Sequence, residues 1–375
     1  MPLFRVYVAG VGEKKQTGSG QGKVEVAAFL ERNASRKNHQ LLRRFTPGSV
    51  VRARRFNCRV EITTCFLCSI TLRALATISA QVLLNGGQVV SWKNDRGEEW
   101  LFMSSKANGK SSKAIRGGIS VCLPQFGNLG SLFHPSPRNK LWSIDSCPSP
   151  RDATSNRSSV DLLFKPTEED TKMWQRSFEL RLHISLGSGK LTLVPRLRNT
   201  DNKSFAFTFS MCNYLSVSDI SEVRVEGLET LDYFDNLLKR KRLTEQADAV
   251  TFDGEVSLSL SGGIVDRVYL HTPANIAVID HEKKRTFVLH KEGLTDAVVW
   301  NPWEKMAKAI PDLGDHDYKN MLYVCSAAFE NPIVLKPMEE WKGRQELSAV
   351  SSSYCSGQLD PQKVLLYAKL AHPQQ

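Results

Sequence analysis

The chain lacks a hydrophobic segment long enough to cross a membrane. Residues 62–72 carry no charge, but 11 residues are too few, because a membrane-spanning helix needs about 20 apolar residues. The next uncharged stretch, residues 74–92, is interrupted by Asn85, Gly86, Gly87 and several other polar residues. The sequence therefore predicts no transmembrane helix and no association with a membrane.

A basic surplus on the main part of the chain is also missing. The formal net charge is +11, from 50 Lys and Arg against 39 Asp and Glu. Residues 1–70 hold 13 basic and 4 acidic residues, a surplus of +9, whereas the other 305 residues hold 37 and 35, a surplus of only +2. A protein that binds phosphates along a duplex carries its basic surface on the folded domain. This distribution argues against nucleic-acid binding.

The eight cysteines form neither a disulfide framework nor a zinc motif. A chain of 375 residues can bury a core without disulfides, and scattered thiols suit a reducing compartment. Cys65 and Cys68 form a C-x-x-C pair, but no second pair or nearby histidine completes a metal-binding set. We interpret them as buried small hydrophobic residues, and the sequence predicts no metal site.

The N-terminal region differs in composition from the rest of the chain. The first 55 residues are rich in Arg and Lys, contain Ser and Gly, and have few acidic residues. A transit peptide, a disordered extension or a mis-joined reading frame would each explain this composition. We expect residues 1–70 to be a basic, disordered extension and residues 72–365 to form the folded domain. The protein is expected in the cytoplasm, or in a plastid if the extension is a transit peptide.

From residue 80 onward, the dominant pattern is the alternation of apolar and polar residues that is typical of half-buried strands. Residues 178–186 alternate in this way, residues 187–189 predict a turn, and residues 191–197 complete a hairpin. Further short strands are predicted at residues 88–92, 100–103, 141–144, 160–164, 205–209, 274–279, 286–289, 297–300 and 321–329. The best helix signal is residues 167–174, where Thr167 and Asp170 match a capping arrangement. The sequence predicts an all-β protein, a large antiparallel β-sandwich with few short helices.

Three segments combine charge, glycine and aromatic residues in an unusual way: residues 113–127, 134–142 and 298–303. Each segment also has a purely structural interpretation. Gly117 and Gly118 could form a bulge, Arg116 could form a surface ion pair, and the tryptophans could belong to the core.

Six motifs in a fixed order favour a functional interpretation. They are residues 91–94 (Ser-Trp-Lys-Asn), 115–118 (Ile-Arg-Gly-Gly), 124–127 (Pro-Gln-Phe-Gly), 217–220 (Val-Ser-Asp-Ile), 300–303 (Trp-Asn-Pro-Trp) and 341–347. Together they resemble the glucose-6-phosphate 1-epimerases. These are the hexose-phosphate mutarotases of the galactose-mutarotase-like superfamily, which include plant apospory-associated protein C-like proteins. The resemblance extends from about residue 72 to about residue 365.

The resemblance implies a single β-sandwich with a sugar cleft on one sheet. It also implies an isomerase that interconverts the α and β anomers of hexose 6-phosphates, such as glucose 6-phosphate, in carbohydrate metabolism. A general base removes the O1 proton and a general acid protonates the ring oxygen, so that the ring opens and closes again on its other face. The reaction needs no metal and no nucleotide. We therefore expect no cofactor, and we expect a monomer.

The family's substrate-binding residues can be carried over to three positions. Arg116 matches one substrate-binding arginine, and Arg138 matches a second, although the stretch 134–138 is one residue shorter here. Guanidinium groups suit a phosphate dianion because their donors form a fork. Phe133 replaces a glutamine of the family. Asp266, which follows a loop insertion rich in Ser, Leu and Gly, matches an aspartate that binds sugar hydroxyls.

The catalytic pair of the family is replaced. Cys212 occupies the position of the family's histidine acid, and Cys325 occupies that of its carboxylate base. A buried thiol without a cationic neighbour stays protonated and is a poor base. Glu330 lies five residues after Cys325, which is the opposite face of a regular strand. His134 is the remaining candidate for proton transfer, although a loop histidine is more often a solvated bystander.

These observations leave three interpretations open. The chain is an active hexose-phosphate 1-epimerase with substituted catalytic groups, a pseudoenzyme that binds sugar phosphates through Arg116 and Arg138 without turnover, or an all-β interaction domain without a ligand. The sequence favours family membership, and the thiols favour the second interpretation on physical grounds.

Overall fold

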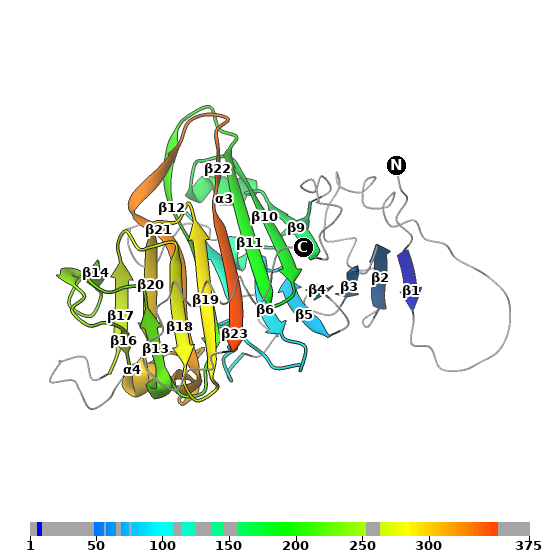
Figure 1. Ribbon diagram of the computed structural model, residues 1–375. Helices are drawn as coiled ribbons and strands as arrows, with labels where there is room; N and C mark the ends of the chain where they lie inside the picture. Colours follow the sequence, from blue (N-terminus) through cyan, green and yellow to red (C-terminus); the bar gives the residue numbers. More distant parts are fainter. Residues whose placement is uncertain are drawn as a thin grey trace.

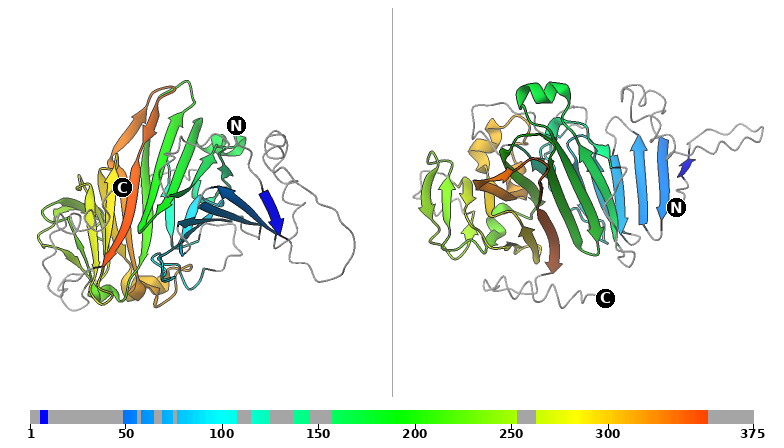
Figure 2. Two further views of the ribbon diagram at one scale, coloured as in Figure 1. Left: turned by 45° about the vertical axis from the view of Figure 1, so that its right-hand side comes forward. Right: turned by 90° about the horizontal axis from the view of Figure 1, so that it is seen from above.

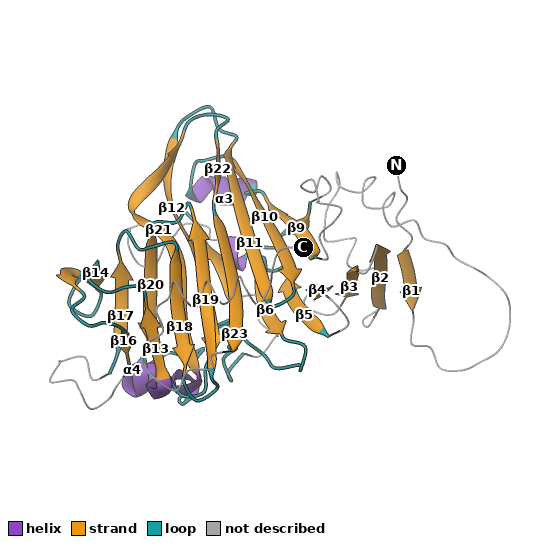
Figure 3. Ribbon diagram, in the orientation of Figure 1, coloured by secondary structure: helices purple, strands orange, loops and turns teal. Residues whose placement is uncertain are grey.

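The computed structural model describes residues 6–9, 49–55, 58–64, 69–74, 77–107, 115–124, 137–145, 157–252 and 263–351. These residues form two large antiparallel sheets that pack on one another, with a few short helices at their margins (Figure 1, Figure 3). The predicted fold class, a large antiparallel β-sandwich, is confirmed. Across these ranges, no helix is long and apolar enough to cross a membrane.

The first sheet has 13 strands in the order β1-β2-β3-β4-β5-β6-β7-β12-β21-β20-β17-β14-β15. Their bounds are β1 (Val6–Ala9), β2 (Ser49–Arg55), β3 (Cys58–Thr64), β4 (Ser69–Ala74), β5 (Ile78–Leu83), β6 (Gln88–Lys93), β7 (Ile119–Cys122), β12 (Phe205–Ser216), β21 (Met321–Leu335), β20 (Asp296–Asn301), β17 (Val265–Tyr269), β14 (Asp232–Asp235) and β15 (Lys241–Thr244). Because β7, β12 and β21 are direct neighbours, three segments that are far apart in the sequence lie side by side.

The second sheet has 10 strands in the order β16-β13-β18-β19-β23-β11-β10-β9-β8, and β22 pairs with β11. Their bounds are β16 (Val250–Thr251), β13 (Val223–Glu226), β18 (Asn275–Asp280), β19 (Arg285–Glu292), β23 (Arg344–Ser351), β11 (Lys190–Asn199), β10 (Phe178–Gly187), β9 (Ser158–Phe164), β8 (Ser143–Ile144) and β22 (Glu340–Lys342). The predicted hairpin is confirmed as β10 and β11, in register from Phe178 opposite Asn199 to Gly187 opposite Lys190.

The main hydrophobic core lies between the sheets. Leu180, Leu182 and Ile184 of β10 are completely buried in it, whereas the intervening Arg181 and His183 are partly exposed. This alternation is the one read from the sequence, because successive residues of a strand point to opposite faces.

A group of buried polar side chains joins the two sheets through β12, β21 and β23. Asn213 of β12 and Gln345 of β23 exchange amide hydrogen bonds of 3.1 and 2.7 Å, and the Ser326 hydroxyl of β21 donates to the same Gln345 oxygen at 2.8 Å. All three residues are completely buried. Asn213 and Ser326 therefore point towards the second sheet, and their neighbours along β12 and β21 point away from it.

The helical elements are short. They are α3 (Glu168–Met173), α4 (Trp303–Ala309), η2 (Pro137–Asn139), η3 (Ile220–Glu222) and η4 (Asp317–Asn320). The predicted capping arrangement is confirmed, because the Thr167 hydroxyl accepts from the Asp170 amide and the Asp170 carboxylate accepts from the Thr167 amide. The sequence pattern did not predict α4.

The prediction of a strand at residues 100–103 is wrong. This segment forms only isolated bridges, to Leu215 and to Gly117, and its backbone amides donate in turn to Trp92 and Tyr214. Trp100, Leu101 and Phe102 are buried because the segment lies between several others, so the apolar run arises without continuous pairing to one strand.

The N-terminal strands β1, β2 and β3 pair one after another beside β4 and extend the first sheet beyond the second (Figure 2). Ser69 and Ile70 of β4 are already buried, close to the expected start of the domain at residue 72. The division into an extension at 1–70 and a domain at 72–365 stays a prediction. Residues 352–375, and all of the loop insertion at 257–263 except Gly263, lie outside the described residues.

Replacing Gln345 with leucine is expected to destabilise the fold strongly. The change leaves the buried Ser326 hydroxyl and the Asn213 amide without the partner that both share, which costs about 2–3 kcal/mol of the free energy of unfolding. Urea denaturation measures this loss. Gln81→Leu is the matched control, because Gln81 is only partly buried and contacts a single hydroxyl; equal losses for the two variants would contradict the prediction.

Candidate active site

Cys212 and Cys325 lie directly opposite each other on the neighbouring strands β12 and β21. Both thiols are buried, and they belong to a second hydrophobic cluster on the face of the first sheet that points away from the second sheet. That cluster also contains Val268, Leu270, Val298, Ala327 and Phe329. The structure thus brings together the two positions that the sequence assigned to catalysis.

A third thiol lies beside this pair. The sulfur of Cys122 in β7 is 3.9 Å from that of Cys212, and the Ser210 hydroxyl is 3.3 Å from the Cys212 sulfur. The hydrogen bond with Cys212 and burial raise the pKa of Cys122 well above its usual value, and burial raises the pKa values of Cys212 and Cys325. All three thiols are therefore protonated at neutral pH and are poor bases.

Three aromatic side chains stand next to the thiols. Tyr214 and Tyr323 lie opposite each other, two residues from Cys212 and Cys325, and their rings are 4.7 Å apart. Trp300 of β20 lies opposite Tyr323, with its ring 5.5 Å away. Burial raises the pKa of Tyr214 to about 12, although the neighbouring Arg116 and Arg138 act in the other direction, and burial also raises that of Tyr323.

Arg116 reaches this group from the segment before β7. Its Nη1 donates to the Tyr214 hydroxyl at 3.2 Å, and its Nε donates to the Asp312 carboxylate at 2.8 Å. The side chain of Arg116 is about a quarter exposed. The structural interpretation of Arg116 as one half of an ion pair is therefore correct, and the same side chain also lies at the site.

The two glycines after Arg116 allow this placement. Gly117 and Gly118 have φ angles of +135° and +61°. A Cβ atom would lie 2.5 Å from the Phe102 carbonyl oxygen at the first position and 2.1 Å from the Val89 carbonyl oxygen at the second. Only glycine fits such close backbone approaches, so the Gly-Gly pair fixes the path of the chain that delivers Arg116.

Arg138 lies in η2, close enough to Tyr214 for their charges to interact. Burial lowers the pKa of Arg138, whereas its electrostatic interactions with Cys122, Tyr214, Tyr323 and Cys212 raise it, and the net pKa lies above the usual value. The turn around it is held by a hydrogen bond of 3.0 Å from the Trp142 indole to the Pro137 carbonyl. Phe133 and His134, which precede this turn, lie outside the described residues.

Asp266 of β17 lies opposite Trp300, so it is on the same sheet face as the thiols. Its carboxylate accepts a hydrogen bond of 2.7 Å from the Asn236 side chain, and burial raises its pKa. The polar groups of this sheet face thus extend from Arg116 to Asp266. Glu330 is engaged elsewhere, because it forms an ion pair with Arg242 and lies 3.4 Å from the His271 Nδ1.

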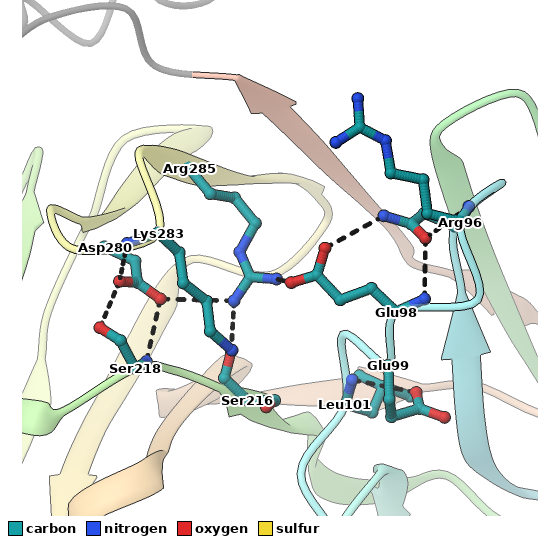
Figure 4. Close-up of polar contacts among 10 residues, drawn as sticks. Arg96, Glu98, Glu99, Leu101, Ser216, Ser218, Asp280, Lys283 and Arg285 are labelled. Atoms are coloured by element: carbon teal, nitrogen blue, oxygen red, sulfur yellow. Dashed lines mark hydrogen bonds and ion pairs between the residues drawn. The ribbon is translucent and has the colours of Figure 1, made fainter.

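An ionic cluster around the buried residues Arg285 and Asp280 holds the end of β12 in place (Figure 4). Arg285 donates to the Ser216 carbonyl at 2.7 Å and forms ion pairs with Glu98 at 2.8 Å and with Asp280 at 3.3 Å. Asp280 in turn accepts from the Ser218 hydroxyl and amide. The cluster fixes the Val-Ser-Asp-Ile motif and the segment that carries Tyr214.

Sequence reasoning did not assign roles to several of these residues. Tyr214 and Tyr323 carried a signal, because they lie two positions from the assigned cysteines and share their sheet face. Asp312 carried none, since only the folded chain brings it to Arg116. In the part of the chain that the structure describes, no group of three or more His, Cys, Asp or Glu side chains could hold a metal ion.

Comparison with known proteins identifies the family. Residues 69–348 match the family model described as aldose 1-epimerase, which is about three-quarters of the chain. The chain belongs to the aldose 1-epimerase family. Its resemblance to hexose-phosphate mutarotases, expected from six motifs, is thereby supported over the same region.

Relatives within the aldose 1-epimerase family narrow the comparison. A protein of Cenchrus ciliaris, provisionally named glucose-6-phosphate 1-epimerase, is 58% identical over 301 residues, which are 79% of this chain and 89% of that protein. A protein of Escherichia coli (strain K12) with the same provisional name is 29% identical over 256 residues, or 67% of this chain and 80% of that protein. The crystal structure of a provisionally named mutarotase from Salmonella typhimurium superposes with a TM-score of 0.66 at 22% identity, covering 82% of this chain and 95% of that chain. The similarity to the Salmonella typhimurium structure shows that the two proteins share a fold.

Replacing Gly118 with alanine is expected to lower the free energy of unfolding by about 2 kcal/mol or more, because the new Cβ meets a backbone oxygen. Gly97→Ala is the matched control. Gly97 also has a positive φ, +78°, but nothing lies within 4 Å of an added Cβ, so its loss should be about 1 kcal/mol. Thermal and urea denaturation measure the free energy of unfolding of both variants. If Gly97→Ala loses as much stability as Gly118→Ala, the steric argument is refuted.

The raised pKa values of the thiols predict slow alkylation. Each unit of increase reduces the thiolate fraction about tenfold, so Cys212 and Cys325 should react with iodoacetamide at pH 8 at least about tenfold more slowly in the native protein than in urea. Peptide mass spectrometry measures the rate at each cysteine. Fast labelling of Cys325 in the native protein would mean that a thiolate, and hence a base, is present.

Proposed function

We propose that this chain acts on hexose 6-phosphates as a glucose-6-phosphate 1-epimerase, an isomerase that interconverts their α and β anomers. The proposal rests on one observation: Arg116 donates a hydrogen bond to the Tyr214 hydroxyl, the charge of Arg138 also lowers the pKa of that phenol, and Tyr214 lies two residues from Cys212 at the family's catalytic positions. The provisional names of the relatives from Cenchrus ciliaris and Escherichia coli support the same substrate class.

In this proposal, the phosphate binds to the two arginines and the sugar ring lies over the thiols. Arg116 and Arg138 supply forked, permanently charged donors, which favour a phosphate dianion over a neutral sugar. Trp300 offers an apolar ring surface next to Tyr323, and Asp266 supplies acceptor oxygens for hydroxyl groups. Each part of the ligand then meets a group of matching chemistry.

The reaction needs one group that takes the O1 proton and one that protonates the ring oxygen. Among the described residues, the side chains beside Arg116 and Arg138 that can exchange a proton are the three thiols, the phenols of Tyr214 and Tyr323, and the Asp312 carboxylate that pairs with Arg116. Because burial keeps the thiols and phenols protonated, each can donate to the ring oxygen, but none of them is a base at neutral pH.

The alternative function is a sugar-phosphate-binding protein without turnover. A face that holds the phosphate but offers no base would bind hexose 6-phosphates and exchange their anomers at close to the uncatalysed rate. Exchange spectroscopy of glucose 6-phosphate by NMR separates the two functions. A rate above that of buffer alone supports the epimerase, and an unchanged rate together with binding supports the sugar-phosphate-binding protein.

Restoring both catalytic groups is expected to raise the exchange rate. The double variant Cys212→His with Cys325→Glu should exchange anomers about 100-fold faster than the unmodified protein, because it gains an acid and a base. Each single variant should gain far less, since the two groups act as a unit. A double variant that is folded by circular dichroism and binds glucose 6-phosphate, yet is no faster, would contradict the assignment of positions 212 and 325.

The proposal places a monomeric protein in the cytoplasm, or in a plastid if the basic residues 1–70 are a transit peptide. The surplus of basic residues in this region supports the second location. Imaging a fluorescent protein fused behind residues 1–70 would distinguish the two.

A further inference from the structure

Arg116, one of the two proposed phosphate ligands, already holds an anion. Its Nε is 2.8 Å from an oxygen of Asp312, and its Nη1 is 3.2 Å from the Tyr214 hydroxyl. A phosphate is bound most strongly by two parallel N–H donors of one guanidinium group. Because Asp312 engages Nε, a phosphate that approaches this edge of Arg116 meets a carboxylate in the same place.

The carboxylate can leave this position without movement of its backbone. The backbone of Asp312 is held on both sides: helix α4 ends three residues before it, at Ala309, and the next residue, Leu313, is completely buried. Asp317 stabilises the turn that follows Leu313. Its carboxylate accepts hydrogen bonds from the Gly314 amide at 2.7 Å and from the Ser104 hydroxyl at 2.8 Å. The Asp312 side chain itself is 55% exposed, so rotation about its own bonds carries it into solvent.

We propose that Asp312 competes with the phosphate group for Arg116 and is displaced when a hexose 6-phosphate binds. This inference rests on the proposed function and adds to it a residue that sets the affinity and the selectivity of the site. The charges support it. Arg116 and Arg138 together carry two positive charges, and a sugar phosphate carries about −2 at neutral pH. The three groups are neutral together once Asp312 has turned away.

Ligands without a phosphate do not gain from the exchange. A hydroxyl group offers Arg116 a weaker, uncharged acceptor, so a neutral hexose leaves the ion pair with Asp312 intact. The carboxylate therefore acts as a barrier that an anionic ligand overcomes and a neutral one does not. The Asp312 carboxylate also returns to Arg116 as the sugar phosphate leaves, which shortens the lifetime of the complex between the protein and the sugar phosphate.

The test compares ligand affinities of full-length variants by isothermal titration calorimetry. Asp312→Asn should bind glucose 6-phosphate about two- to fivefold more tightly than the unmodified protein, the range expected when a partly exposed ion pair no longer has to be broken. Its affinity for glucose should not change. Asp315→Asn is the matched control, because Asp315 lies in the same turn, is 53% exposed and pairs with Lys106 instead; its affinities should equal those of the unmodified protein.

Two further variants separate competition from a structural effect. Asp312→Glu keeps the carboxylate and should restore an affinity close to that of the unmodified protein. In an Arg116→Gln background, which binds through Arg138 alone, Asp312→Asn should no longer improve affinity, because the competitor has lost its target. An improvement that persists in this background would overturn the proposal.

The outcomes also separate this inference from the proposed function. If the unmodified protein binds glucose 6-phosphate and Asp312→Asn binds it equally or more weakly, Asp312 positions Arg116 rather than competing for it, and the inference alone fails. If neither protein binds glucose 6-phosphate, the proposed function and the inference fail together.

Discussion

The hydrogen bonds between Asn213, Gln345 and Ser326 decide which face of the first sheet carries the site. These polar groups are completely buried in an apolar core, where an unpaired amide costs about 1–3 kcal/mol. A shift of β12 or β21 by one residue would expose them on the outer face and turn Cys212 and Cys325 into the sandwich. The amide cluster therefore specifies the register, and every contact among the thiols, the tyrosines and Trp300 depends on it.

Anion binding and proton transfer require different physical conditions, and the proposed site meets the conditions for anion binding more fully than those for proton transfer. An arginine remains charged even when it is largely buried, so Arg138 keeps its charge next to the thiols. A thiol in the same surroundings loses its charge, because burial penalises the thiolate. Two substitutions at catalytic positions can therefore remove the base while leaving the proposed phosphate ligands in place.

Patterns within short stretches of sequence predicted most of the fold. The alternation along β10 and the capping pair Thr167 and Asp170 depend on neighbouring residues only, and the structure confirms both. The segment 100–103 was mistaken for a strand because burial between several segments selects the same short run of apolar residues as a buried strand does. Asp312 could not have been found, since its contact with Arg116 joins two segments almost 200 residues apart in sequence. The family motifs supplied what local patterns could not, namely which distant segments share one face.

The replacement of a carboxylate by Cys325 also changes the electrostatics of the site. The resemblance places a negatively charged base at this position, close to where the sugar ring of an anionic substrate lies. A protonated thiol removes that charge, so the face presented by Arg116 and Arg138 is more positive by one unit than in a relative that has the carboxylate together with a neutral histidine at the position of Cys212. Stronger attraction for phosphate slows its release, because the rate of dissociation falls as the contacts strengthen. The Asp312 carboxylate, which pairs with Arg116, offsets the extra positive charge beside the proposed phosphate position. Because Asp312 is exposed, it does so without adding a charge to the apolar surroundings of the thiols.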